Sequence, residues 1–231
     1  MGRERQDVIR RDFDRIALLS ERGWDHNSHY HSALLRKLPE HLDQALDVGC
    51  GTGELTRLLA LRARKVTGID LSPEMVRVAR ERSGGCGNVS YAVGEYMSVR
   101  LPREGFDCIA AVATAHHMNV EAFLCRACDL LAPGGVLLVL DLYRAATPLD
   151  LLLCAAAVPV NLILRLRHAG ALRRSAALRG AWREHGRHDV VPRLREVRQA
   201  CRRCLPGGAV RRHLLWRYSL VWRKPGLHGA P

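Results

Sequence analysis

The chain has 231 residues, of which 48% are hydrophobic; this suits one folded α/β domain and excludes disorder over most of the length. Its net charge of +13 is local, because residues 161–231 carry 17 Arg or Lys against 3 acidic residues, whereas the first 160 carry 19 against 20. Aromatic residues make up only 5% and do not interleave with the arginines, which disfavours a base-stacking nucleic-acid surface. The N-terminus is charged and lacks an apolar signal core, so we expect a cytoplasmic protein.

The first predicted elements are two helices. Residues 3–20 form an amphipathic pattern whose apolar positions fall mostly on one face. After a turn at Gly23, a second helix is expected from Trp24 to about Leu38. Helical spacing places its His26, His29 and Tyr30 on roughly one face.

The stretch Ala45-Leu-Asp-Val-Gly-Cys-Gly-Thr-Gly-Glu54 reads as a buried strand that runs into a glycine turn and then a helix. Gly49, Gly51 and Gly53 let the backbone turn tightly and approach a bound molecule, and the following helix directs unpaired N–H groups toward it. Dinucleotide-binding folds use a similar turn, but a carboxylate at Asp47 would repel a pyrophosphate. Asp47 instead suits a ligand with an ammonium group, such as an amino acid.

The next two predicted strands are each associated with an acidic residue. The strand of residues 65–70 ends at Asp70, near the spacing from the glycine turn at which an acidic side chain binds the ribose hydroxyls of an adenosine. The strand of residues 89–93 is followed by Glu95. Because parallel strands end at the same edge of a sheet, these acids and Asp47 are expected to line one crevice.

Four stretches carry a family resemblance: Leu46-Asp-Val-Gly-Cys-Gly-Thr-Gly53, Val66-Thr-Gly-Ile-Asp-Leu-Ser-Pro-Glu-Met75, Phe106-Asp-Cys-Ile-Ala-Ala-Val112 and Leu131-Ala-Pro-Gly-Gly-Val-Leu-Leu-Val139. On these stretches, which cover roughly residues 40–145, the chain resembles the class I S-adenosylmethionine-dependent methyltransferases. The resemblance implies a Rossmann-like α/β fold, with a seven-stranded, mostly parallel sheet in the order 3-2-1-4-5-7-6 and helices on both faces. It also implies S-adenosyl-L-methionine as cofactor and S-adenosyl-L-homocysteine as product.

The resemblance further implies roles for matching positions. The three glycines would border the methionine part of the cofactor, and Asp70 would bind the ribose hydroxyls. Leu71 and Met75 would sandwich the adenine, with Glu95 and the backbone of Tyr96 near its edge; many members carry Asp where this chain has Glu95. The expected cofactor-binding set is Asp47, Gly49, Gly51, Gly53, Asp70, Leu71, Met75, Glu95, Tyr96, Ala113 and Tyr30.

The candidate catalytic residues are histidines. A sulfonium methyl is already electrophilic, so the protein mainly has to hold a nucleophile in line and exclude water. A base is needed only if the nucleophile binds in its protonated form. His116 and His117 follow the fourth strand at the mouth of the crevice, although many family members carry a His pair there whatever their substrate, which favours a structural role. In the N-terminal helices, His29 is a further candidate base and Tyr30 a residue that covers the cofactor.

Residues 145–190 depart from the alternation of strands and helices and are expected to form a helical lid or substrate insertion. The apolar run Leu149–Leu166 is shorter than a membrane span and is interrupted by Pro159 and Asn161, which favours a buried or lid-forming helical hairpin. Peripheral membrane contact through residues 149–174 stays open, because four basic residues follow the run: Arg165, Arg167, Arg173 and Arg174. Three further positions are expected to line the pocket from the lid side: His185, His188 and Asp189.

The chain ends in a predicted helix over residues 192–205 and an alternating stretch over residues 210–222 that reads as two paired strands. The expected organisation is a single methyltransferase domain over residues 1–231. It comprises an N-terminal helical cap (1–40), a cofactor-binding core (41–144), a helical lid (145–190) and a terminal helix with a β-hairpin (191–231).

Two Cys-x-x-Cys pairs, Cys125 with Cys128 and Cys201 with Cys204, are of the kind found in zinc sites. However, 72 residues separate them, and both lie in predicted amphipathic helices, where three-residue spacing is simply one face. No metal site is expected, and a cytoplasmic location disfavours disulfides.

These patterns favour methyl transfer to a small-molecule acceptor, at oxygen or nitrogen, by in-line SN2 displacement. Alternatives are a membrane lipid or quinone, RNA bound through the basic C-terminal third, and a non-catalytic cofactor-binding module. Methylation of a nucleic-acid base amino group is disfavoured, because Ala113-Thr-Ala-His-His-Met118 lacks the Asn/Asp-Pro-Pro-aromatic loop of those enzymes. The oligomeric state is open.

Overall fold

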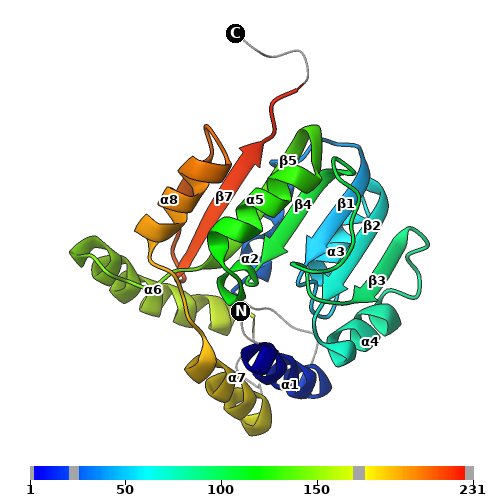
Figure 1. The fold of residues 1–231 in the computed structure, drawn as a ribbon. Coiled ribbons are helices and arrows are strands. Elements are labelled where there is room, and N and C mark those ends of the chain that lie inside the picture. Colours follow the sequence, from blue (N-terminus) through cyan, green and yellow to red (C-terminus); the bar gives the residue numbers. More distant parts are fainter. Residues whose placement is uncertain (1–2, 21–25, 169–174, 227–231) are drawn as a thin grey trace.

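The structure, a computed structural model, describes residues 3–20, 26–168 and 175–226. A seven-stranded sheet in the order β3-β2-β1-β4-β5-β7-β6 forms its centre (Figure 1). The strands are β1 (Leu42–Val48), β2 (Ala63–Asp70), β3 (Val89–Val93), β4 (Phe106–Val112), β5 (Leu131–Leu142), β6 (Ala209–Arg212) and β7 (Arg217–Arg223). β7 pairs antiparallel with β5 and β6, and the other pairs are parallel. The order expected from the sequence is confirmed.

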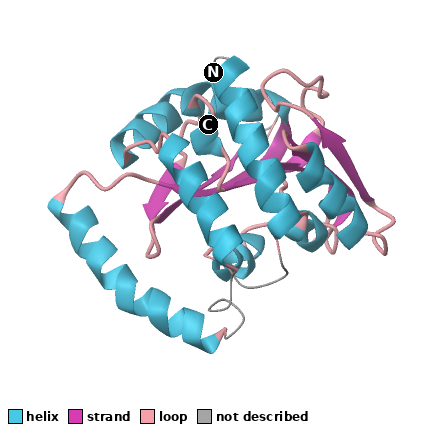
Figure 2. Ribbon diagram, turned by 90° about the horizontal axis from the view of Figure 1, so that it is seen from below, coloured by secondary structure: helices cyan, strands magenta, loops and turns pink. Residues whose placement is uncertain are grey.

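Helices cover both faces of the sheet (Figure 2). They are α1 (Arg3–Leu19), α2 (Ser28–Leu35), α3 (Glu54–Leu59), α4 (Pro73–Arg82), α5 (Val120–Leu130), α6 (Pro148–Arg167), α7 (Ala176–His188) and α8 (Leu194–Cys204), with a 3-10 turn η1 (Ala115–His117) after β4. The expected turn at Gly23 and helix start at Trp24 lie outside the described residues.

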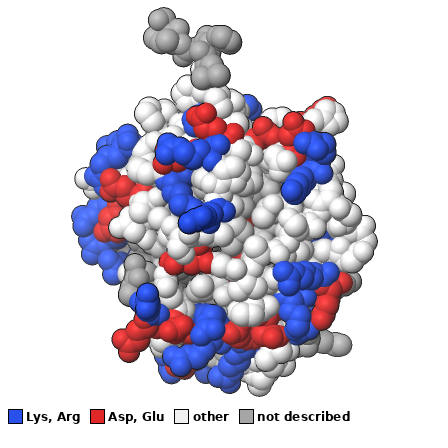
Figure 3. All heavy atoms as spheres, turned by 45° about the vertical axis from the view of Figure 1, so that its right-hand side comes forward, with Lys and Arg blue, Asp and Glu red and all other residues white. Residues whose placement is uncertain are grey.

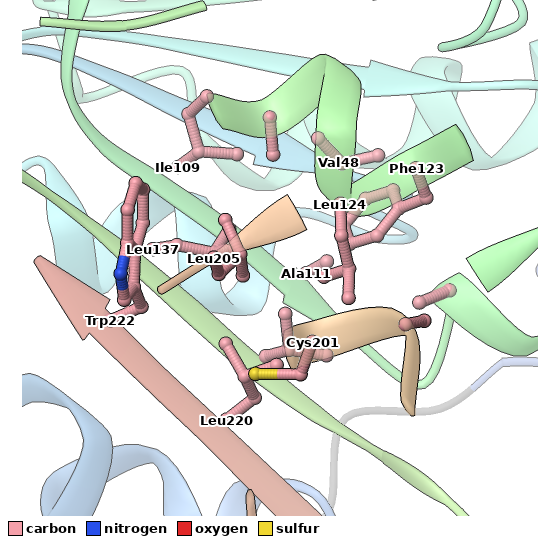
Figure 4. Packing of buried hydrophobic residues seen from close by; sticks show 14 of the residues in the cluster. Val48, Ile109, Ala111, Phe123, Leu124, Leu137, Cys201, Leu205, Leu220 and Trp222 are labelled. Atoms are coloured by element: carbon pink, nitrogen blue, oxygen red, sulfur yellow. The ribbon is translucent and has the colours of Figure 1, made fainter. Parts of the chain in front are cut away.

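Alternation along the central strands builds a core on each face of the sheet, because successive side chains of a strand point to opposite faces. In β4, Ile109 packs in the cluster beneath α5 and α8 (Figure 4), whereas its neighbours Cys108 and Ala110 pack with α2 and α3. β5 repeats the pattern with Leu137 on one side and Leu138 on the other. The sheet is therefore buried on both faces, as parallel sheets require.

A third apolar cluster lies at the edge where the parallel strands end. It joins Ile16 of α1, Met75 of α4 and Leu178 of α7, all buried. Figure 1 shows α1 and α7 side by side beneath this edge, and the two helices contact each other. Segments far apart in the sequence thus form a roof over the ends of β1, β2 and β4.

The apolar run of residues 149–166 is not the expected hairpin. α6 is one continuous helix with Pro159 inside it, begun by a capping box between Thr147 and Asp150. By length and composition alone it could cross a membrane, yet only 11% of its most apolar window is buried. Figures 1 and 2 show α6 extending away from the sheet. Of the described residues in the 145–190 insertion, α7 provides the lid.

The expectation that disulfides are absent is wrong for one pair of cysteines. Cys125 of α5 and Cys204 of α8 are bonded, with their Cα atoms 5.0 Å apart. The Cys-x-x-Cys spacing in the sequence pairs each of these cysteines with another cysteine on its own helix, Cys128 or Cys201. Tertiary packing instead sets α5 against α8 and brings one member of each pair together.

Candidate active site

A cavity of about 490 Å³ lies between the strand ends and the α1–α7 roof. Its volume is in the range of small-molecule binding pockets. It is lined by the glycine turn, by the residues that follow β2, β3 and β4, and by side chains of α1 and α7. It is therefore the crevice that the sequence predicts, closed by two helices.

The glycine turn forms the floor of the cavity. Gly49, Gly51 and Gly53 all have positive φ, at +67°, +51° and +78°. A Cβ at Gly49 would overlap the side chain of Thr114, whereas a Cβ at Gly51 would meet nothing within 4 Å. Gly51 therefore leaves open space in which a ligand can approach the backbone.

Asp47 is a buried carboxyl group in the wall of the cavity. The Thr56 hydroxyl donates to its Oδ2 at 2.6 Å. Burial, with a smaller contribution from the charge of Asp70, raises the pKa of Asp47 to about 7. A cationic group in the cavity would favour the ionised form, as expected for a site that binds an amino-acid ammonium.

Asp70 lies at the end of β2, and its carboxylate faces the cavity. Its Oδ2 accepts a hydrogen bond from the Gly51 N–H and its Oδ1 from the Ser72 N–H, both at 2.9 Å. Burial is the main cause that raises the pKa of Asp70, and the nearby carboxylate of Asp14 adds to it. Each oxygen retains capacity to accept a second hydrogen bond, such as one from a hydroxyl.

Asp14 is a residue that the sequence analysis missed. It lies on α1, and the Ser72 hydroxyl at the start of α4 donates to its Oδ1 at 2.5 Å. The sequence offers no signal for this contact, because Asp14 is one of many charged residues in an amphipathic helix.

The far end of the cavity holds the residues expected around an adenine. Leu71 and Met75 line it, together with Glu95, which accepts a hydrogen bond from Nε2 of Gln6 in α1. The Tyr96 ring points away into the core against Phe123, and burial raises the pKa of its phenol. The ring of Tyr96 is therefore part of the core, and a contact of its backbone with an adenine stays a prediction.

The fourth strand ends at a strained position. Ala113 lines the cavity and has φ +52°, a conformation that costs a residue with a Cβ roughly 1 kcal/mol or more. Its N–H donates to the Leu140 carbonyl at 2.8 Å. This hydrogen bond holds the turn that directs the next residues toward the cavity.

The wall of the cavity beside His117 is apolar and aromatic. Phe13 of α1 and Trp182 of α7 lie edge-to-face with ring centroids 6.3 Å apart, and Phe13 also meets the His117 ring at 5.5 Å. Leu178 extends this wall toward Met75, with which it packs in one apolar cluster. The sequence places Phe13 on an apolar helix face but cannot show that the face covers a cavity.

The two histidines after β4 have opposite environments. His116 is outside the lining of this cavity; its Nδ1 is 2.6 Å from Asp141 Oδ1. Burial opposes its charge, but Asp141 and Asp189 outweigh burial and raise the pKa of His116 to about 9. His117 lines the cavity, and burial together with the charge of His116 lowers its pKa to about 3. At neutral pH, His116 is protonated and His117 is neutral.

Two predicted site residues on α2 are not at the cavity. Tyr30 donates its hydroxyl to the Leu214 carbonyl at 2.7 Å, and His29 is exposed. The neighbouring positions Asn27 and His31 line the cavity instead. The rotation of α2 about its axis, set by packing of its apolar side on the sheet, decides which face meets the ligand.

The lid residues predicted near the pocket lie just behind His117. His185 is buried, with its ring 5.2 Å from that of His117. Its Nε2 is 3.3 Å from Oδ1 of Asp189, and the Nδ1 atoms of His185 and His188 are 3.3 Å and 3.2 Å from Oδ2 of Asp12. None of these three lid residues lines the cavity itself.

The cavity fits S-adenosylmethionine by its own chemistry. A buried carboxyl group at Asp47 matches an ammonium, and the Asp70 carboxylate matches two hydroxyls. The open space at Gly51 admits a ligand against the backbone. Leu71 and Met75 offer apolar surface to a flat ring.

Comparison with known proteins agrees with this geometry. Residues 46–139 match the family profile of the methyltransferase domain. The chain is 30% identical over 209 residues to an uncharacterized methyltransferase of Mycobacterium tuberculosis, covering 89% of this chain and 99% of that protein. It is 31% identical over 170 residues to a ubiquinone biosynthesis O-methyltransferase of Xanthomonas axonopodis pv. citri, covering 68% of this chain and 71% of that protein.

Solved structures share the fold. The N-methyltransferase NodS from Bradyrhizobium japonicum, in complex with S-adenosyl-L-homocysteine, superposes with a TM-score of 0.61 at 17% identity, covering 96% of this chain and 98% of that chain. At this identity the likeness concerns the fold alone.

Proposed function

This chain belongs to the class I S-adenosylmethionine-dependent methyltransferases, and we propose that it methylates a small, largely apolar acceptor at a hydroxyl or amino group. The observation that carries the proposal is the apolar, aromatic wall that Phe13 and Trp182 form beside His117. A cavity roofed by two helices accommodates a small molecule better than a polymer.

When bound, S-adenosylmethionine supplies an electrophilic methyl group. The protein contributes position and a dry environment: Asp47 and Asp70 hold the two ends of the ligand's polar part, and α1 and α7 keep water from the reacting atoms. Leu71 and Met75 hold the adenine.

His117 is the polar group at the acceptor end. Because it is neutral, its ring has one N–H and can donate a hydrogen bond to an oxygen or nitrogen of the acceptor and hold that atom toward the methyl group. A pKa of about 3 makes it a weak base, so we assign it positioning more than proton removal. His116 is protonated and faces away from the cavity, and His29 is outside it, so neither acts as the base.

RNA is a weaker candidate, because aromatic side chains do not interleave with the arginines of the C-terminal third, and several of its basic residues are paired with acids. Arg203 lies 2.6 Å from Glu121, Arg212 lies 3.1 Å from Asp150 and Lys224 lies 2.9 Å from Glu104. On the face shown in Figure 3, basic and acidic side chains are interspersed. A continuous basic track for a phosphate backbone is not apparent on that face.

Transfer of labelled methyl groups from S-adenosylmethionine into fractionated host extract tests the proposal. We expect label in the small-metabolite fraction, and its loss with Asp70→Ala, which weakens cofactor binding by about 1.5–3 kcal/mol because its buried partners lose their acceptor. The matched control is Asp43→Ala, which removes an exposed acid paired with Arg64. Label confined to RNA or protein would refute a small-molecule acceptor.

A second candidate acceptor is a quinone or lipid held in a membrane, and α6 favours it. Large apolar side chains of α6 are exposed: Leu149, Leu151, Leu152, Val158, Leu162, Ile163 and Leu166. A soluble helix normally buries such a stripe. Arg165 and Arg167 in the last turn are exposed as well and suit anionic headgroups; the predicted Arg173 and Arg174 lie outside the described residues. One relative is a ubiquinone biosynthesis O-methyltransferase, which also supports a quinone as the acceptor.

We therefore propose that α6 lies on a bilayer surface, and vesicle flotation tests this. The protein should float with vesicles that contain anionic lipid. The double variant Leu151→Glu/Leu162→Glu should stay at the bottom, because each charge opposes insertion of the apolar face. Leu61→Glu, at a side chain 80% exposed elsewhere, is the matched control and should float. A wild-type protein that does not float, or α6 variants that change only the oligomeric state, would refute the membrane role.

A further inference from the structure

Three imidazole rings surround one carboxylate oxygen behind the acceptor end of the cavity. Asp189 Oδ1 lies 3.4 Å from Nδ1 of His117, 3.3 Å from Nε2 of His185 and 3.7 Å from Nε2 of His116. The three histidines are 8%, 2% and 5% exposed, and the Asp189 side chain is 15% exposed. Residues from η1 and from the end of the lid thus meet in the interior.

We propose that these residues bind one divalent transition-metal ion of the zinc type, with His116, His117 and Asp189 as ligands and the fourth position open to water or acceptor. One ligand atom from each of the first three lies within 4.8 Å of the others. Two imidazoles and a carboxylate are donors that zinc accepts at sites with an open fourth position, whereas magnesium prefers oxygen. The sequence predicts no metal site, so the site comes from tertiary structure alone.

The spacing agrees with a tetrahedral ion. Metal–ligand bonds of about 2.0–2.1 Å set neighbouring ligand atoms about 3.3–3.4 Å apart in a tetrahedron. The separations from Asp189 Oδ1 to the two proposed histidine ligands are 3.4 Å for His117 Nδ1 and 3.7 Å for His116 Nε2, so binding of an ion needs only a small shift of His116. Octahedral magnesium, with bonds of about 2.0–2.1 Å, would set them near about 3 Å.

The hydrogen bonding of the cluster is incomplete without an ion. Both ring nitrogens of His117 and Oδ1 of Asp189 are buried and have no hydrogen-bond partner among the described residues. A buried polar atom without a partner costs free energy. Coordination of a shared cation would satisfy His117 Nδ1 and Asp189 Oδ1 together.

The outer side of the cluster has a carboxylate that orients a metal-binding histidine. Asp141 lies 2.6 Å from Nδ1 of His116, and its other oxygen accepts a hydrogen bond from the His116 backbone N–H at 2.8 Å. Asp12 of α1 lies 3.3 Å from Nδ1 of His185, which borders the cluster. Of the two carboxylates, Asp141 holds Nδ1 of His116 and directs its Nε2 toward Asp189, as outer carboxylates do at metal sites.

An ion at this position would fix the lid. It would join η1, which follows β4, to Asp189 just after α7. His117 lies at once in the cluster and in the cavity wall, so the ion would adjoin the acceptor. Metal binding would thereby fix the geometry of the acceptor end.

The test uses the untagged, full-length protein, stripped with a chelator and titrated with Co²⁺ and Zn²⁺. We expect one equivalent of metal, intense d–d absorption typical of tetrahedral Co²⁺, and no thiolate-to-cobalt charge-transfer band. Zinc in about 100-fold excess over its dissociation constant should raise the Tm by about 5 °C. X-ray absorption at the zinc edge should show imidazole scattering, a readout that needs no variant.

Variants locate the site. Asp189→Asn and His117→Gln should abolish stoichiometric binding, and Asp141→Asn should weaken it about 10- to 100-fold through the orientation of His116. His41→Gln, at an exposed histidine, is the matched control. Binding of S-adenosylhomocysteine and the circular dichroism spectrum report whether each variant is folded. A wild-type protein that binds no stoichiometric metal, a thiolate signature, or unchanged binding by Asp189→Asn would overturn the proposal and leave a hydrogen-bonded network.

Discussion

At the scale of single residues, the two buried acids of the cofactor site differ in how they are held. Asp70 accepts from two backbone N–H groups, whereas Asp47 accepts from one hydroxyl. Backbone donors favour the ionised form of Asp70. Asp47 has less of this support, and its carboxyl group titrates near neutral pH in the free protein.

This difference predicts a pH dependence of cofactor binding. With a pKa of about 7, Asp47 is mostly protonated at pH 6 and ionised at pH 8. A ligand ammonium favours the ionised form and lowers this pKa, so binding releases a proton below pH 7. The affinity for S-adenosylhomocysteine should therefore fall about tenfold from pH 8 to pH 6, measured by calorimetry.

The control for the pH effect is Asp47→Asn. It should bind more weakly and lose the pH dependence, because the titrating group is gone. An affinity of the wild-type protein that is the same at both pH values would contradict the assignment of Asp47 to the ammonium.

A second prediction concerns the glycine turn. Gly49→Ala should destabilise the protein by about 2–4 kcal/mol, because its Cβ would overlap Thr114 and its φ is +67°. Gly85→Ala, where a Cβ meets nothing within 4 Å, is the control and should change stability little. Urea unfolding measures both, and equal stabilities would show that the turn can relax.

At the scale of elements, the sequence predicts well those features of the fold that depend on a local pattern of residues. Apolar alternation and the glycine turn define the strands, and Asp70 follows from its spacing to that turn. The prediction that Tyr30 covers the cofactor is wrong, because the rotation of α2 about its axis depends on what its other side packs against. Phe13 becomes a site residue only through packing of α1 against α7, and Asp189, which was expected to line the pocket, instead lies behind His117.

The link between α5 and α8 gives the element-scale prediction. The Cys125–Cys204 bond closes a loop of 79 residues, for which loop entropy alone corresponds to about 4 kcal/mol. Reduction should lower the Tm of the wild-type protein by about 10 °C. Cys204→Ser should be insensitive to reductant, whereas Cys86→Ser, at a free cysteine, should behave like wild type. A wild-type Tm unaffected by reductant would contradict a stabilising bond.

At the scale of the whole molecule, the cofactor site and the exposed apolar helix are separate. No described residue of α6 lines the cavity, and α6 contacts the rest of the protein along its inner side: Asp150 pairs with Arg212 of β6, and Asn161 lies 2.7 Å from Nε2 of His26. The cofactor cavity, formed by the sheet edge with α1 and α7, can therefore bind its ligand without any contribution from the outer face of α6.

Because α6 and the cofactor site are separate, we expect vesicle binding and cofactor binding to change independently. The Leu151→Glu/Leu162→Glu protein, which should lose vesicle binding, should bind S-adenosylhomocysteine within about twofold of wild type, since neither side chain lines the cavity. Calorimetry on the same preparation used for flotation checks this. A tenfold loss of affinity would show that α6 supports the site after all.

The contacts of α1 bear on turnover. Gln6 reaches Glu95 near the expected adenine position, Phe13 meets His117 beside the expected acceptor position, and the next residue, Asp14, holds the start of α4. α1 thus covers both the cofactor part and the acceptor part of the cavity. Spent cofactor or methylated product can leave past α1 only if α1 also loosens its contacts with the other part. Exchange becomes a single shared event, and its rate, more than that of the methyl transfer, would set the pace of the enzyme.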